Sequence, residues 1–80
     1  MRLTKGGEHM TLTMAPVEKE VIINKVTGKD DTRKFLASLG FVEGAQVSVV
    51  SELSGNMIIN VKDSRIALGK QLARRILVEE

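Results

Sequence analysis

Residues 39–47 constrain the fold most strongly, because within this short segment a helix has to end and a strand has to begin. Helical spacing in the preceding run places three apolar side chains on one face: Phe35, Leu36 and Leu39. Gly40 then stands where a left-handed helix cap is expected, since glycine adopts a positive φ without a Cβ penalty. Phe41 follows this cap and is predicted to fold back onto Leu36.

A second tight turn is expected at Gly44, after which the residues alternate as in a strand. Similar patterns elsewhere predict five short strands, at residues 20–27, 45–52, 57–62, 65–68 and 76–78. A helix is predicted at residues 31–39 and a single helical turn at residues 69–74. Val26 is out of step with Val21 and Ile23, which predicts a bulge in the first strand.

The connections between these elements are short. Asp30 or Asp31 is expected to cap the helix, because a short acidic side chain accepts hydrogen bonds from the first helical amides. The second and third strands are expected to form a hairpin around residues 53–56. Three apolar residues before the first strand are expected to pack against the sheet: Leu12, Met14 and Val17. Periodicity therefore predicts a small, mostly β domain.

Length and composition limit the domain further. Eighty residues allow one domain with a thin core, which we place at residues 10–80, after a polar leader at residues 1–9 that is expected to be disordered. The chain has no cysteine, no apolar run of the roughly 20 residues that span a bilayer, and no signal-peptide pattern at its start. We therefore expect a cytoplasmic protein.

Charge and polar residues point away from catalysis. Twelve basic residues nearly balance ten acidic ones, for a net charge of +2, so no polyanionic partner is required. His9 is the only histidine and lies in the leader, so the serines lack a general base. The acidic pair Asp30 and Asp31 is better explained by helix capping than by ion binding. The sequence predicts no enzyme, no metal site and no cofactor.

Two surface features remain as candidates for a partner contact. The apolar one comprises Leu53 at the predicted hairpin tip with Met57 and Ile58 behind it. The basic one comprises Lys70, Arg74 and Arg75 near the late helical turn. For both, a solvated surface without function is the simpler alternative.

The order of glycines and apolar runs resembles a known family. Residues 39–41, Gly44 and residues 47–50, followed by residues 66–69 and 76–78, are similar to the signature of the ferrous iron transport protein A (FeoA) family. The resemblance covers about residues 10–78. It implies a small, partly open SH3-like barrel of five strands, with one short helix after the first strand and a helical turn before the last.

The resemblance also implies a function. FeoA proteins are cytosolic accessory proteins of bacterial ferrous iron uptake, and the implied partner is FeoB, a membrane permease with a cytosolic GTPase domain. The implied mode of action is regulation of transport or of complex assembly by contact. Whether the protein activates or inhibits FeoB, whether nucleotide controls docking, and whether it dimerises stay open.

Two other functions compete with this one. Repressors of the diphtheria-toxin-repressor type carry a similar SH3-like domain at their C-terminus, so the chain could be a stand-alone interaction domain. The pI of 9.2 favours a nucleic-acid-binding barrel. The chain lacks tryptophan and tyrosine, and both phenylalanines, Phe35 and Phe41, are expected in the core. The shortage of exposed aromatic side chains argues against both alternatives.

Overall fold

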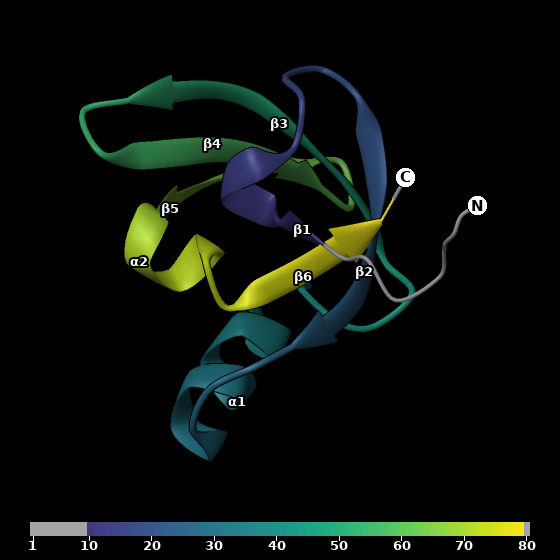
Figure 1. Ribbon diagram of the computed structural model, residues 1–80, viewed down its shortest axis with the longest axis vertical. Coiled ribbons are helices and arrows are strands. Elements are labelled where there is room, and N and C mark those ends of the chain that lie inside the picture. The colour runs from purple at the N-terminus through teal and green to yellow at the C-terminus, as the bar shows by residue number, and fades with distance from the viewer. Residues whose placement is uncertain (1–9, 80) are drawn as a thin grey trace.

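The computed structural model describes residues 10–79, which form one curled antiparallel sheet with three short helical segments (Figure 1). The strands are β1 (Met10–Thr11), β2 (Glu20–Val26), β3 (Gln46–Leu53), β4 (Asn56–Val61), β5 (Ser64–Gly69) and β6 (Ile76–Glu79). The helical segments are η1 (Leu12–Met14), α1 (Asp30–Ser38) and α2 (Lys70–Ala73). The predicted disorder of residues 1–9 lies outside the described residues.

The sheet curls without closing. Its six strands follow the order β1-β6-β2-β3-β4-β5, so β1 and β5 form its two edges. The result is a mainly β, partly open architecture, as the family resemblance implies, with α1 after the first long strand and α2 before the last. Strands β2 to β6 correspond to the five predicted strands, and β1 is an additional short one.

The core fills the concave side of the curled sheet. Alternate residues of the strands point inward, and all the buried residues among those described are apolar. The largest of them are Phe41, Leu12, Ile23, Leu36, Met57, Ile59 and Ile76. Burial of side chains of this size contributes about 1.5–3 kcal/mol each, which in a chain of this length makes the inward face of every strand important for stability.

Helix α1 ends in a Schellman motif. Gly40 has a φ of +105°, and its N–H donates to the Ala37 carbonyl over 3.0 Å. The Phe41 N–H reaches back to the Leu36 carbonyl, also over 3.0 Å. This geometry turns the chain so that Phe41 and Leu36 are both buried.

The start of α1 differs from the prediction. The N-cap residue is Lys29, and its side chain makes no capping hydrogen bond. Asp30 and Asp31 instead occupy the first helical turn, where their charges interact favourably with the helix dipole, and Asp30 forms an ion pair with Arg33. The predicted cap by Asp30 or Asp31 is therefore wrong. Lys29 is the N-cap, and both acidic residues stabilise the first turn from within the helix.

Three apolar residues expected in the core are exposed. Phe35 remains 51% exposed, because α1 contacts the sheet along a stripe that contains Leu36 and not its neighbour. Met14 and Val17 are 70% and 55% exposed, whereas Leu12 and Ala15 of the same segment are buried. All three expectations were wrong. Helical or strand periodicity does not apply to the irregular segment that holds Met14 and Val17.

The predicted bulge in the first strand is confirmed. The register between β2 and β6 shifts between Ile23 and Lys25, which brings Val26 opposite Ile76. A second shift lies in β3, between Val49 and Ser51. Bulges increase local twist, and here they bend the two longest strands around the core.

Candidate functional site

The tip of the β3–β4 hairpin presents the most exposed residue of the predicted apolar surface. Leu53 is 66% exposed, at the end of β3, and pairs with Asn56 across a two-residue turn. Ile58 is half-buried on the outward face of β4. Met57 is fully buried and takes no part in this surface, because it points inward with Ile59. The structure therefore removes Met57 from the predicted partner contact.

Helix α2 holds this hairpin tip. The Lys70 Nζ lies 2.9 Å from Oε1 of Glu52, and the Lys70 N–H donates to the Gly55 carbonyl over 3.2 Å. A hollow of about 480 Å³ lies where the turn meets α2; its lining residues are Gly55, Asn56, Gly69, Lys70, Gln71 and Leu72. The tip is thus fixed in position while Leu53 stays in solvent.

The three basic residues of the predicted rim do not form one cluster. Lys70 points to Glu52 at the hairpin. Arg75 lies at the other side of α2, where its carbonyl accepts hydrogen bonds from the N–H and the hydroxyl of Thr27 over 2.7 and 3.2 Å. Its side chain helps to line a hollow beside the start of α1, with Gly28, Lys29 and Thr32. Arg74 is exposed between them.

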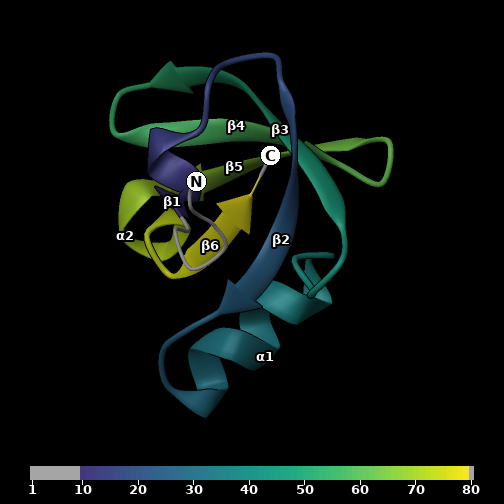
Figure 2. The same cartoon turned by 45° about the vertical axis from the view of Figure 1, so that its right-hand side comes forward.

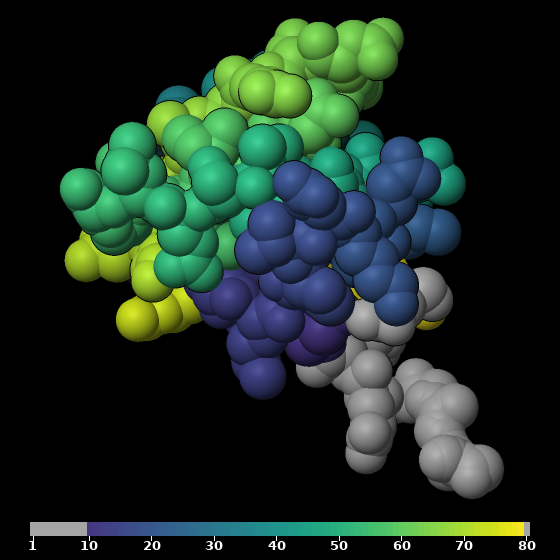
Figure 3. Space-filling view, turned by 90° about the horizontal axis from the view of Figure 1, so that it is seen from above, coloured from purple at the N-terminus to yellow at the C-terminus, as the bar shows by residue number. Residues whose placement is uncertain are grey.

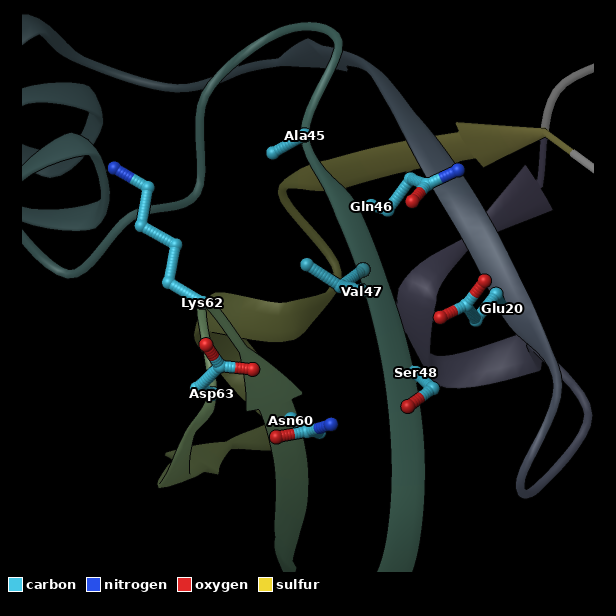
Figure 4. Close-up of a pocket in the computed structure, with 8 residues that line it drawn as sticks. All are labelled: Glu20, Ala45, Gln46, Val47, Ser48, Asn60, Lys62 and Asp63. Carbon is cyan, nitrogen blue, oxygen red and sulfur yellow. The ribbon is translucent and has the colours of Figure 1, made fainter.

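A polar groove of about 300 Å³ crosses the outward face of the sheet and was not predicted (Figure 4). Glu20 of β2 faces Ser48 of β3, which in turn faces Asn60 of β4. Lys62 and Asp63, in the turn after β4, complete one side. Figure 4 shows Lys62 pointing away from Asp63, and the Lys62 stem lies over Gly40. Sequence spacing cannot find this groove, since its residues come from three strands and a turn.

Residues that could catalyse a reaction or bind a metal ion are few in the described part of the chain. Within residues 10–79, no three His, Cys, Asp or Glu side chains come together as a metal ion would require. His9 lies outside this range. None of the described helices is long and apolar enough to cross a membrane. The predicted lack of catalytic, metal and cofactor sites stays a prediction.

Exposed apolar side chains outside the predicted surface lie in three further places, one of which is Ile22 on β2, 39% exposed. Met14 and Val17 belong to the segment before β2, which runs beside β3 and pairs with it at Val49 (Figure 3). Phe35 and Val42 lie on α1 and on the loop that follows it. In Figures 1 and 2, α1 lies at the opposite end of the molecule from the β3–β4 hairpin tip. The apolar surface is therefore divided among separate regions.

Comparison with known proteins identifies related chains. The FeoA domain family matches residues 10–80. An Fe(2+) transport protein A of Methanocaldococcus jannaschii is 35% identical over 69 residues, which cover 86% of this chain and 84% of that protein. The crystal structure of an iron uptake regulatory protein, FeoA, superimposes with a TM-score of 0.82 at 32% identity, over 90% of this chain and 97% of the other.

Other solved structures share the fold. Zinc-complexed FeoA of Stenotrophomonas maltophilia, described as a prokaryotic SH3 domain protein, has a TM-score of 0.77 at 28% identity, over 88% of this chain and 89% of the other. The zinc-bound form of ScaR has a TM-score of 0.81 at 22% identity. This chain aligns over 98% of its own length but only 40% of ScaR. A similarity at this level of identity concerns the fold alone.

Proposed function

The chain belongs to the FeoA family of ferrous iron transport proteins, and from this premise we propose that it is a non-enzymatic, cytosolic accessory protein that regulates FeoB by direct contact. The family match to residues 10–80 is the observation that carries the proposal. The exposed hairpin tip around Leu53 supports binding as the mode of action.

The hairpin tip is the centre of the proposed contact. Leu53 is exposed there on a turn that Lys70 fixes through its ion pair with Glu52 and its bond to Gly55. A surface that is ordered before binding loses less conformational entropy when the complex forms. Ile58 extends the apolar part, and Arg74, the residue after α2, is exposed and positively charged.

Regulation by contact requires a difference in affinity between two states of the partner. A ligand shifts a conformational equilibrium only to the extent that it binds one state better than the other. The GDP-bound and GTP-bound forms of the FeoB GTPase domain are the states to compare. We propose that the hairpin tip binds one of them more tightly.

An NMR titration of the labelled protein with the GTPase domain of FeoB from the same organism tests this proposal. We expect localised shifts around Leu53 and Lys70 that differ between GDP and a non-hydrolysable GTP analogue. Leu53→Ala should weaken binding about tenfold, as expected for an apolar residue at the centre of an interface. Val42→Ala, a matched change at an exposed residue of another region, should leave affinity unchanged.

Two results would contradict the proposal at different levels. No shifts with the GTPase domain and no binding to full-length FeoB would exclude the partner. Binding that Leu53→Ala and Val42→Ala affect equally would keep the partner and exclude the hairpin tip as the centre of contact.

A further inference from the structure

The outer edge of β5 carries unpaired backbone groups. Strand β5 pairs only with β4, and it ends the sheet. The β4–β5 turn has two central residues, Lys62 and Asp63, both with positive φ, and Val61 pairs with Ser64 across it. In a two-residue hairpin of this kind the closing pair is hydrogen-bonded, and bonded and non-bonded pairs then alternate.

This alternation determines which groups of β5 face outward. Ser64, Ile66 and Leu68 direct their N–H and C=O groups toward β4. Arg65 and Ala67 direct theirs away from β4. No backbone bond between elements in residues 10–79 involves Arg65 or Ala67 on that side. The N–H and C=O groups of these two residues are therefore available to a further strand.

We propose that the β5 edge binds an extended segment of the FeoB partner that carries an acidic residue, so that this segment adds a strand to the sheet. This inference rests on the proposed function and assigns it a second contact, separate from the hairpin tip. Addition of a strand to a free sheet edge is a common mode of peptide recognition, in which main-chain hydrogen bonds provide affinity and side chains provide specificity.

Arg65 defines the charge of the proposed segment. It is the only charged residue of β5, it is exposed, and it makes no ion pair with any other described residue. The residue paired with Arg65 on an added strand would have its Cβ about 5 Å away on the same face, within reach of an ion pair. A carboxylate at this position would complement the guanidinium.

Ala67 defines a second position, two residues away on the same face. It is small, exposed and directly opposite Ile58 of β4, whose side chain is half-buried. An apolar side chain opposite Ala67 would lie over it and reach toward Ile58. The expected segment therefore has an acidic and an apolar residue separated by one position.

A second copy of the chain fits this edge less well. Strand β5 brings Arg65 and no carboxylate, so pairing of two β5 strands would leave the guanidinium groups without a counter-charge. A charged residue on an edge strand is also a common device against self-pairing. Charge complementarity thus favours an acidic partner segment.

The test measures binding of the full chain to full-length FeoB of the same organism in nanodiscs. Ala67→Pro removes the outward N–H and leaves the bonds to β4 intact, because proline is tolerated on an edge strand where its nitrogen faces outward. Ala67→Ser keeps this N–H and is the matched control. Arg65→Glu reverses the charge at the edge, and Lys34→Glu makes the same change on α1, at an exposed lysine.

We expect Ala67→Pro and Arg65→Glu each to weaken binding about tenfold or more, the size of effect expected when a charge-assisted or main-chain contact is lost. Ala67→Ser and Lys34→Glu should change affinity less than about twofold. Amide hydrogen exchange on the unmodified chain should show that FeoB protects the N–H groups of Arg65 and Ala67. This last measurement is independent of how the variants fold.

Each other outcome has a defined meaning. If the unmodified chain binds FeoB but Arg65 and Ala67 gain no protection, the edge proposal is overturned and the proposed function stands. If the chain does not bind FeoB, both fail. If sedimentation of the chain alone shows an association that Ala67→Pro abolishes, the occupant is a second copy and the acidic segment is excluded.

Discussion

Gly40 ends α1 because it adopts a positive φ, and its surroundings leave little room for a Cβ. Its φ of +105° lies in a region that side-chain-bearing residues rarely adopt. A Cβ added there would lie 3.2 Å from Cγ2 of Val61, a buried residue of β4. Gly44 also has a positive φ, +86°, but a Cβ added to it would meet nothing within 4 Å.

This difference predicts unequal costs of the same substitution. Gly40→Ala should lower the free energy of unfolding by about 2–3 kcal/mol, through backbone strain and the contact with Val61. Gly44→Ala should lower it by about 1 kcal/mol, through backbone strain alone. Urea denaturation of both variants measures the difference, and equal losses would show that the packing above Gly40 is unimportant.

At the scale of elements, α1 depends on a single fully buried side chain. Leu36 is fully buried, whereas its neighbour Phe35 is largely in solvent. The helix has only nine residues, which is too short to be stable alone in water. Its position must therefore come from Leu36 and from the Schellman motif that follows.

Replacing each of these two neighbours by alanine should show that the loss of stability depends on how deeply the side chain is buried and not on its size. Leu36→Ala should cost about 2–5 kcal/mol, because it leaves a cavity in the core. Phe35→Ala should change the free energy of unfolding by less than about 0.5 kcal/mol, as for most exposed positions. Chemical denaturation monitored by far-UV circular dichroism provides both values. A large loss in the Phe35 variant would mean that its ring is packed.

At the scale of the whole molecule, positive charge is distributed over several faces. Lys70 pairs with Glu52 at the hairpin tip, and Arg33 pairs with Asp30 on α1. Arg65 lies on the β5 edge, and Arg75 lies beside the connection to α1. Nucleic-acid-binding domains instead concentrate their basic residues on one face or stripe.

This distribution predicts no significant binding to nucleic acid. Fluorescence anisotropy with labelled single-stranded and double-stranded oligonucleotides should stay unchanged up to about 10 µM protein at about 50 mM salt, conditions in which non-specific binders with dissociation constants of about 1–100 µM respond. An anisotropy increase that declines steeply with added salt would contradict the prediction and support a phosphate contact.

Much of the fold could be predicted because helices and strands follow from local patterns of apolar residues and glycines. Glycine at the end of an apolar helical run located the end of α1, and period-two alternation located β2 to β6. Alternation also places Met57 on the same face of β4 as Ile59, and the structure shows that this face points into the core. A partner contact through Met57 does not fit this burial.

The candidate surfaces could be predicted only in part. Leu53 was identified as exposed because it adjoins a predicted turn. The separation of Lys70 from Arg75, the groove between Glu20 and Asp63, and the exposed position of Phe35 could not be predicted. Each depends on how segments distant in sequence pack, and residue spacing contains no information about that packing.

Local sequence patterns specify the helices and strands of this protein and their order, because backbone conformation and side-chain alternation depend on neighbouring residues. Which strand lies at the edge of the sheet can be seen only in the tertiary structure. The sheet order places β5 last, with Arg65 and Ala67 facing away from β4, since the chain turns into α2 and then pairs β6 with β2. Strand pairing depends on contacts between residues that are distant in sequence. It therefore determines which backbone N–H and C=O groups stay unpaired at the edge of the sheet.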